Sequence, residues 1–200
     1  MASFANQRPT VGPGPGTNVP VYFQAGETFL TPELQHLDSL WHSKAVGRRL
    51  PARSDFDLRE LKAVLRNLVI MDTTRDAGRM RFFVRFMGSE LDSQLMPMTG
   101  HYVDEVLPEY FRDKWQALWC RTLQFMRPTR SLSRAEFRER EYAYVESLYC
   151  PLSDEGVTQS KMIAAVFYHQ LDVGPPKVRA LAQSLKLEFD AAAYSDQERY

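Results

Sequence analysis

The chain has 200 residues, and its 25 Lys and Arg balance its 25 Asp and Glu. This balance argues against nucleic acid as the main partner, because phosphate binding depends on clustered basic charge. No apolar run approaches the roughly 18 residues that a membrane span needs, and the first ten residues lack the features of a signal peptide. Cys120 and Cys150 fit no metal spacing, and two thiols in a chain of this length are typical of a reducing compartment, so we expect a cytoplasmic protein.

The N-terminal region predicts a flexible tail followed by a helical extension. Residues 1–26 contain the run VGPGPGTNVP, in which alternating Pro and Gly disfavour both helix and sheet. Residues 27–66 contain two helical patterns, the first of which starts at a good N-cap, Thr31, with Pro32 at the first helical position. Its apolar stripe consists of Leu34, Leu37, Leu40 and Trp41.

The second helical pattern is LRELKAVLRNL, preceded by Asp57. Asp57 and Glu60 have the spacing of a capping box, although Asp replaces the usual Ser or Thr. The expected buried stripe of this helix consists of Leu58, Leu61, Val64 and Leu65.

The pattern then changes to that of a β-hairpin. NLVIMDTT is apolar and rich in β-formers, and Asp-Ala-Gly at 76–78 signals a turn. The following run, RMRFFVRFMG, alternates. It should place Phe82, Val84 and Phe86 on one face of the strand and Arg81, Phe83 and Arg85 on the other.

Short helices, one long helix and three strands follow. SELDSQL and YVDEVLP predict single-turn helices, and EYFRDKWQALWCRTLQFM predicts a long amphipathic helix that Pro128 ends. The strands are expected in RSLSRAEF, YAYVESLYCPL and SKMIAAVFYH. Residues 172–200 should hold a last helix, PKVRALAQSLKLEF, that packs outside the domain core.

This order of elements resembles the plan of a PAS domain. The run FMGSELDSQLMPMTGHYVDEVLPEYF is similar to the PAS core, with Gly88 after the second strand and Thr99-Gly100 before the VDEVLP helix. The flanking LWHSKAVGRRLPARSDFD and ESLYCPLSDEG resemble short bacterial proteins, of the alphaproteobacterial type, that consist of a single PAS domain. The resemblance covers about residues 31–171. It implies an α+β fold with a five-stranded antiparallel sheet and a PAS core at 67–171.

The resemblance implies a sensory or regulatory protein that binds a small molecule or a partner protein. An adaptor would keep its interior filled by its own side chains, whereas a ligand sensor would leave a cavity. Enzymatic activity is disfavoured, because Asp104 and Glu105 are adjacent on a helix and cannot form an acid–base pair. A small α+β-cone enzyme with a buried acid is the more distant alternative.

We expect no heme, flavin or metal. Heme-binding PAS domains often use a histidine of the long helix, and residues 109–127 contain none. His101 is the nearest candidate, but a solvated turn explains it better. Flavin photoreceptors of this fold carry a reactive cysteine where this chain has GSELDSQL. Zinc-type histidine pairs are missing from the sequence.

The expected pocket lies between the long helix, the short helix 101–107 and the inner sheet face. Aromatic side chains with a few polar groups are typical of small-molecule sites, although ordinary core packing explains most of them. Arg85 and Glu146 would orient a polar ligand, or would instead form salt bridges on a sheet surface. The candidate residues are Phe83, Arg85, Tyr102, Val106, Trp115, Trp119, Thr122, Tyr144 and Glu146.

We also expect a homodimer. The Leu34 to Trp41 stripe lies outside the PAS core and needs burial. It would cover either its own sheet or a second copy of the chain. A signalling partner protein remains the other expected partner.

Overall fold

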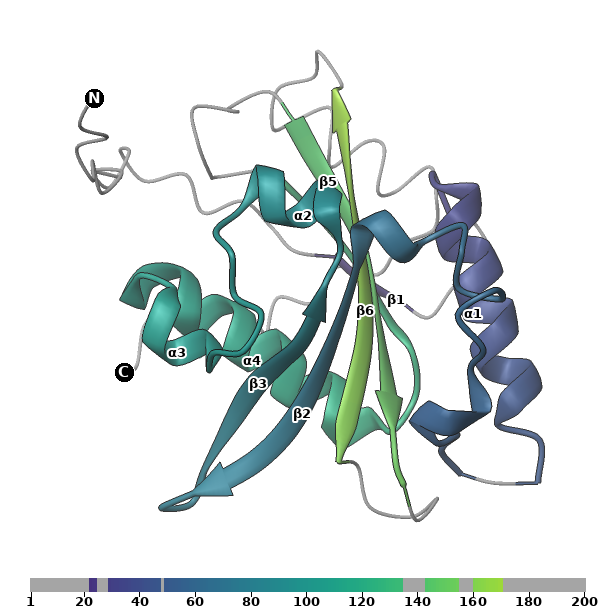
Figure 1. The fold of residues 1–200 in the computed structure, drawn as a ribbon, viewed down its shortest axis with the longest axis horizontal. Helices are drawn as coiled ribbons and strands as arrows, with labels where there is room; N and C mark the ends of the chain where they lie inside the picture. Colours follow the sequence, from purple (N-terminus) through teal and green to yellow (C-terminus); the bar gives the residue numbers. More distant parts are fainter. Residues whose placement is uncertain (1–21, 25–28, 48, 135–142, 155–159, 171–200) are drawn as a thin grey trace, which may run out of the picture.

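Six antiparallel strands form one sheet in the computed structural model, which describes residues 22–24, 29–47, 49–134, 143–154 and 160–170 (Figure 1). The strand order across the sheet is β1-β4-β5-β6-β2-β3. The strands are β1 (Tyr22–Gln24), β2 (Leu68–Asp76), β3 (Arg79–Met87), β4 (Thr129–Arg134), β5 (Ala143–Leu152) and β6 (Lys161–Gln170). The α-helices are α1 (Pro32–Lys44), α2 (Ser89–Gln94), α3 (Val103–Val106) and α4 (Glu109–Phe125), and the 3-10 helices are η1 (Arg53–Asp55) and η2 (Leu65–Asn67).

The predicted fold class is confirmed. Strands β2 to β6 form the expected five-stranded antiparallel sheet, with short helices and one long helix between β3 and β4. The predicted C-terminal helix in 172–200 lies outside the described residues. Within the described part of the chain, every helix is too short or too polar to cross a membrane.

Strand β1 lies inside the segment predicted as a flexible tail. Its three residues pair with β4, where Phe23 is opposite Ser131. The Pro- and Gly-rich run ends at Pro20, and Tyr22 and Phe23 are good β-formers. The tail prediction for residues 1–26 is therefore wrong at 22–24.

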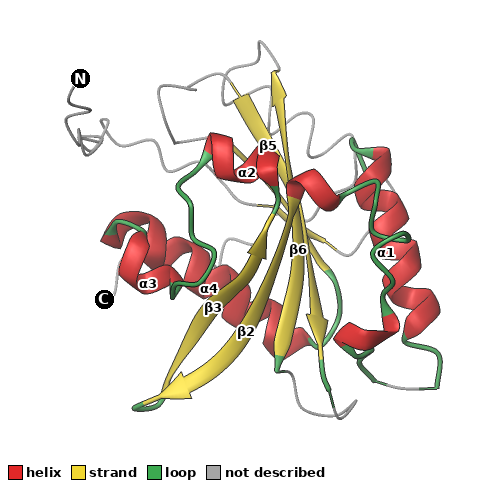
Figure 2. Ribbon diagram, in the orientation of Figure 1, coloured by secondary structure: helices red, strands yellow, loops and turns green. Residues whose placement is uncertain are grey.

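Helices cover the sheet on both sides (Figure 2). Helix α4 packs on one face, here called the α4 face, together with α3. Helix α1 packs on the opposite face, here called the α1 face. Two separate apolar clusters result, one on each side of the same strands.

The predicted stripe of α1 covers the protein's own sheet. Leu34, Leu37 and Trp41 are buried against the α1 face, and Leu40 is half-buried. The Trp41 indole N–H donates a hydrogen bond to the carbonyl oxygen of Pro151 at 2.9 Å, which anchors the helix to the end of β5. The stripe therefore does not need a second copy for its burial.

The prediction of a second helix after Asp57 is wrong. Residues 58–64 form successive turns and η2 follows, so the chain makes i to i+3 hydrogen bonds such as Val64 N–H to the Leu61 carbonyl. The capping pair does form in part, since the Asp57 N–H donates to Glu60 Oε2 at 2.9 Å. Leu61 and Val64 are both buried, and their three-residue spacing matches 3-10 turns. Leu58, at the start of the turns, is exposed.

The β2–β3 hairpin forms as predicted. Ala77 and Gly78 both have positive φ, 46° and 83°, which is the two-residue turn that matches the twist of paired strands. The alternation of β3 breaks near its end, where Ile70 pairs with Phe86 but Met71 pairs with Val84.

Arg85 is the extra residue of this β-bulge. A bulge moves the following side chains to opposite faces. Phe86 consequently packs with the cluster on the α1 face, whereas Phe82 and Val84 belong to the α4 face. The predicted grouping of Phe86 with Phe82 and Val84 is therefore wrong.

A glycine fixes how closely β3 approaches η2, and this generates a prediction. A Cβ atom at Gly88 would lie 2.3 Å from the Leu65 carbonyl oxygen and 2.4 Å from that of Arg66. Backbone atoms cannot move aside as a side chain does, so Gly88→Ala should lower the free energy of unfolding by about 1–3 kcal/mol or more. Urea unfolding measures this loss. Gln124→Ala, at an exposed position on α4, is the control and should change it by less than about 0.5 kcal/mol. Equal midpoints for wild type and Gly88→Ala would contradict the close approach.

Candidate functional site

The α4 face brings together four of the nine predicted site residues. Trp119 is 7% exposed and Thr122 is fully buried, and the half-buried Trp115 lies beside Trp119 with ring centroids 5.8 Å apart. The Trp115 ring also meets the Tyr149 ring of β5 at 6.3 Å. Val106 of α3 packs against the same cluster.

The protein's own side chains fill the space between α4 and the sheet. Leu91, Leu118, Leu123, Tyr149 and Met162 pack there and are between 0% and 7% exposed. Beside them, between β3, α3 and α4, lies a hollow of about 10 Å³, with Met80, Arg112, Gln116 and Trp119 among its lining residues. A space of this size holds about one water molecule.

A bidentate ion pair, Arg81 with Asp104, lines this hollow. The Arg81 guanidinium donates to the two Asp104 carboxylate oxygens at 2.8 and 2.9 Å, and to Glu105 Oε1 at 2.8 Å. The two adjacent acids thus bind the same cation. Hydrogen bonding from Arg81 holds the pKa of Asp104 below its usual value, so this carboxylate is ionised at neutral pH and is poorly suited to be a general acid.

Two of the buried polar side-chain atoms that lack a hydrogen-bond partner among the described atoms lie where α4 packs on the sheet. They are Tyr149 Oη and Trp119 Nε1. Burial raises the pKa of Tyr149, and the Ser131 and Ser147 hydroxyls and the Trp119 indole only partly offset this. These groups therefore lie near the phenol without meeting hydrogen-bond geometry. A polar atom placed between the phenol and the indole would satisfy both groups.

Phe83, Arg85 and Tyr102 lie on the surface and not in the predicted pocket. Phe82 and Val84 point to the α4 face, so the residues between and beside them point away from it. Arg85 is 62% exposed and pairs with Asp72, which matches the alternative of a salt-bridged sheet surface.

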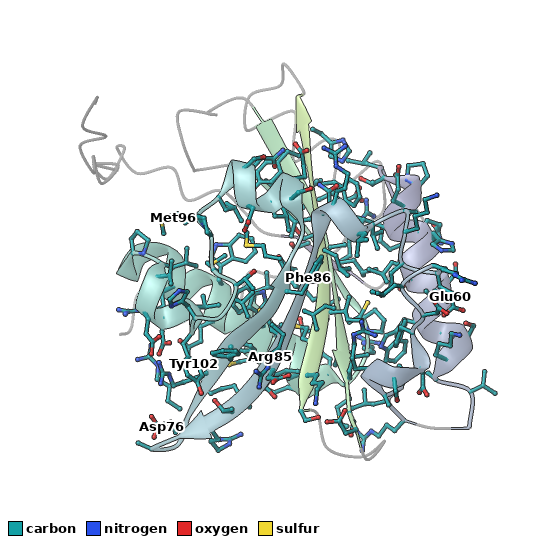
Figure 3. All side chains as sticks on the ribbon, viewed as in Figure 1. Glu60, Asp76, Arg85, Phe86, Met96 and Tyr102 are labelled. Atoms are coloured by element: carbon teal, nitrogen blue, oxygen red, sulfur yellow. The ribbon has the colours of Figure 1, made fainter. Side chains whose placement is uncertain are left out.

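These side chains stack in order along β3. The Phe83 and Tyr102 rings meet edge to face at 5.1 Å, Arg85 lies 4.6 Å from the Phe83 ring, and Arg81 lies 3.9 Å from the Tyr102 ring. Figure 3 labels Arg85 and Tyr102, which lie beside each other at β3. We call Arg81, Tyr102, Phe83 and Arg85 the aromatic–arginine ladder.

The segment before α3 covers the outer edge of β3. Val84 N–H donates to the His101 carbonyl at 3.0 Å, and Gly100 N–H donates to the Val84 carbonyl at 2.8 Å. Further along, the Gln116 amide donates to the Met80 carbonyl at 2.9 Å. The positive φ of Gly100, 84°, lets the chain turn into this position.

Glu146 lies on the α1 face, opposite the predicted pocket. Both Glu146 and its ion-pair partner Arg130 of β4 are at most 1% exposed. Glu146 Oε1 accepts the Leu30 N–H at 3.0 Å, and Oε2 accepts the Thr31 hydroxyl at 2.7 Å. His169 Nε2 of β6 lies 2.8 Å from Thr31 Oγ1 and 3.7 Å from Glu146 Oε2. We call Thr31, Arg130, Glu146 and His169 the Glu146 cluster.

The cluster changes the role predicted for Thr31. Within the described part of the chain, its side chain makes no capping bond to α1, because its hydroxyl contacts Glu146 and His169 instead. Burial raises the pKa of Glu146, but the nearby His169, the hydrogen bond from Thr31 and the charge of Arg130 outweigh burial and hold the pKa below its usual value. Glu146 is therefore an ionised acceptor beside the start of α1.

The remaining candidates contribute little to either site. The Tyr144 side chain lies outside the described residues, and only its backbone pairing with Arg134 and His169 is defined. Among the residues that the structure describes, no group of three or more His, Cys, Asp or Glu could hold a metal ion. His101 is exposed, and burial raises the pKa of the Cys150 thiol, which makes that cysteine unreactive.

The lowered pKa of Glu146 generates a prediction about pH. A carboxylate with a lower pKa in the folded chain contributes stability above its unfolded pKa, and this stability is lost as the pH falls. Glu146→Gln breaks a buried ion pair and should cost about 3–5 kcal/mol of unfolding free energy near neutral pH. The difference from wild type should shrink when urea unfolding is repeated at about pH 4.

Glu105→Gln is the matched control. It removes a carboxylate that also pairs with an arginine but is 53% exposed, so its cost should be below about 1 kcal/mol. A Glu146→Gln penalty that does not change between the two pH values would show that the charge of Glu146 is not what stabilises the cluster.

Comparison with known protein families agrees with this architecture. A family model described as PAS domain matches residues 30–166, which is more than half of the 200-residue chain. No curated protein and no solved structure matched the chain. The matched region begins just before α1 and ends within β6. The chain therefore belongs to the PAS domain family.

Proposed function

We propose that this PAS protein is a non-enzymatic regulator that acts by binding a partner protein. PAS domains in general have sensory or signalling roles, and the resemblance to short single-PAS proteins favours a bacterial, cytoplasmic regulator. The observation that carries the proposal is the filled interior, where the protein's own side chains occupy the space between α4 and the sheet. A hollow of about 10 Å³ leaves room for water but not for a ligand.

The charges near both sites also favour binding over catalysis. Asp104 and Glu146 each face an arginine, and both have pKa values below their usual range. A general acid needs the opposite shift. These carboxylates stabilise the structure around them. Recognition of a partner would then depend on neighbouring side chains.

The aromatic–arginine ladder is the surface that best fits a partner protein. Arginine and aromatic residues are enriched at the energetic centres of interfaces. Arg85 is 62% exposed, and Phe83 and Tyr102 are half-buried. In Figure 1, α1 lies to the side of β6, and none of the described helices lies over the front of the lower β2–β3 hairpin.

A small-molecule sensor is the second candidate. The unpaired Tyr149 Oη and Trp119 Nε1 favour it, since a ligand oxygen would satisfy both. Helix α3 has only four residues and few internal hydrogen bonds, so it is the wall that would move to admit a ligand.

Native mass spectrometry of protein purified from its own host separates these two candidates. We expect masses that are multiples of the 23.1 kDa chain, without an added small molecule, because the hollow among the described residues has room for only about one water molecule. The preparation should be colourless, without heme or flavin absorption. A retained mass that is released on unfolding would favour the sensor. In that case Trp115→Ala should weaken its binding by about 1–3 kcal/mol.

If a partner protein binds to the ladder, substitutions in the ladder should weaken the binding of that partner. The double variant Phe83→Ala/Arg85→Ala removes the exposed end of the ladder and should reduce recovery of a crosslinked host partner at least about tenfold, as for a loss of 1–2 kcal/mol at an interface centre. Arg66→Ala is the matched control, because Arg66 is 76% exposed and pairs with Glu90 away from the ladder. Equal recovery by both variants would contradict the proposal.

A further inference from the structure

Three large apolar side chains are exposed in the described part of the chain. They are Val46 at 79%, Leu58 at 57% and Phe125 at 42%. Val46 lies in the loop after α1, Leu58 lies in the turns after Asp57, and Phe125 is the last residue of α4. Three different segments thus each present one apolar side chain to solvent.

Two arginines lie beside the Phe125 ring. The guanidinium carbons of Arg121 and Arg127 are 5.4 and 5.5 Å from the centre of this ring. The Arg127 side chain is exposed, and Met126 before it has a φ of 52°, which ends α4 at this point. The end of α4 therefore presents an aromatic ring and positive charge together.

The other two apolar side chains lie in a stretch with surplus positive charge. Residues 44–62 contain six Lys or Arg and three Asp or Glu, whereas the whole chain is neutral. One of the three acids, Glu60, is bound by Lys44 at 2.7 Å. Three of the cations are exposed and pair with no acid among the described residues, namely Arg49, Arg59 and Lys62. These cations are therefore available to an anionic partner.

The exposed apolar side chains lie along the margin of one packed cluster. The residue before Val46 and the residue after Phe125 both pack against the apolar cluster on the α1 face. Phe56 and Leu61, on either side of Leu58, belong to this cluster. Figure 1 shows the loop after α1 and the C-terminal end of α4 in the lower part of the molecule. We call Val46, Arg49, Leu58, Arg59, Phe125 and Arg127 the basic–apolar surface.

We infer that the basic–apolar surface binds the surface of an anionic lipid bilayer. The arginines contact the anionic headgroups, and the three apolar side chains enter the boundary between headgroups and acyl chains. This inference goes beyond the proposed partner binding, because it assigns a second surface and a second kind of partner. It requires no membrane-spanning segment, since the chain stays on one side of the bilayer.

The distribution of the apolar side chains favours a bilayer over other anionic partners. A protein interface usually has a contiguous apolar centre, whereas Val46, Leu58 and Phe125 come from three separate segments. Aliphatic side chains add little to the binding of nucleic acid phosphates, which depends on charge. A bilayer accepts separate apolar protrusions, because each of them enters the same fluid layer.

Cosedimentation of the full-length chain with lipid vesicles tests the inference. Vesicles of mixed phosphatidylcholine and phosphatidylglycerol should bind the protein at least about tenfold better than vesicles of phosphatidylcholine alone. Added salt should weaken this binding, because it screens exposed charges. The double variant Arg49→Gln/Arg59→Gln should lower the partition coefficient roughly twentyfold or more, since each basic residue near an anionic bilayer contributes about fivefold.

Two single variants complete the design. Leu58→Ser should lower the partition coefficient about fivefold, because it removes an inserted apolar side chain without changing charge. Arg66→Gln is the control, since Arg66 is 76% exposed but pairs with Glu90 of α2, and it should change the coefficient by less than about twofold. All these positions are exposed, so the variants should stay folded, and circular dichroism verifies this.

Three results would overturn the inference. The first is equal binding, or none, to the two kinds of vesicle at low salt. The second is an equal loss for the double variant and for Arg66→Gln. The third is binding to vesicles that Leu58→Ser leaves unchanged, together with tighter binding to soluble polyglutamate or duplex DNA, which would identify a different anionic partner. Each of these results leaves the ladder experiment unaffected, because that experiment measures recovery of a protein partner by Phe83 and Arg85.

Discussion

The carboxylate of Glu146 joins parts of the chain that are distant in sequence. It lies on β5, pairs with Arg130 on the neighbouring β4, approaches His169 on β6 and accepts two hydrogen bonds from the segment before α1. Because the carboxylate is fully buried, it cannot be solvated if one of these donors leaves. The position of α1 on the sheet, and with it the burial of the whole α1 face, therefore depends on this one group being paired.

The two faces of the sheet use different physical means to hold their helices. On the α4 face, apolar and aromatic side chains interlock, and the polar atoms Tyr149 Oη and Trp119 Nε1 lie among them without a described partner. On the α1 face, directed hydrogen bonds fix the start of the helix before apolar contacts continue along it. Apolar packing tolerates small shifts, whereas hydrogen bonds define one register. The α1 face is therefore the more specific of the two.

Local signals in the sequence predicted the elements that local interactions define. Pro32 marked the start of α1, the turn at Ala77 and Gly78 marked the hairpin, and the period of α4 revealed Trp115 and Trp119. The segment after Asp57 was mispredicted because apolar residues at 61, 64 and 65 fit both an α-helix and successive 3-10 turns. The bulge at Arg85 depends on pairing between strands, which periodicity within one strand does not contain.

The Glu146 cluster could not be derived from the sequence for a similar reason. Thr31 is separated from Glu146 by 115 residues and from His169 by 138, and strand register decides whether they meet. Glu146 was a candidate because a charge within a strand is unusual, but it was predicted on the wrong face of the sheet. Alternation shows which residues of a strand share a face, and it does not show which helix covers that face. Arg130 and His169 carried the same signal as charged or titratable residues within predicted strands.

The short segment between α2 and α3 has a consequence for how copies of this protein meet in concentrated solution. A strand at the edge of a sheet normally presents a row of unpaired backbone groups. Another extended chain can pair with these groups, and such pairing is a common start of aggregation. Here Gly100 and His101 bond to both backbone groups of Val84, and Gln116 occupies the Met80 carbonyl. These bonds occupy backbone groups at two positions of the outer edge of β3, so an added strand would have to displace them. The run MTGHYVDEVLP is too short to build a core. It covers part of this sheet edge and thereby hinders pairing with the sheet of a neighbouring molecule.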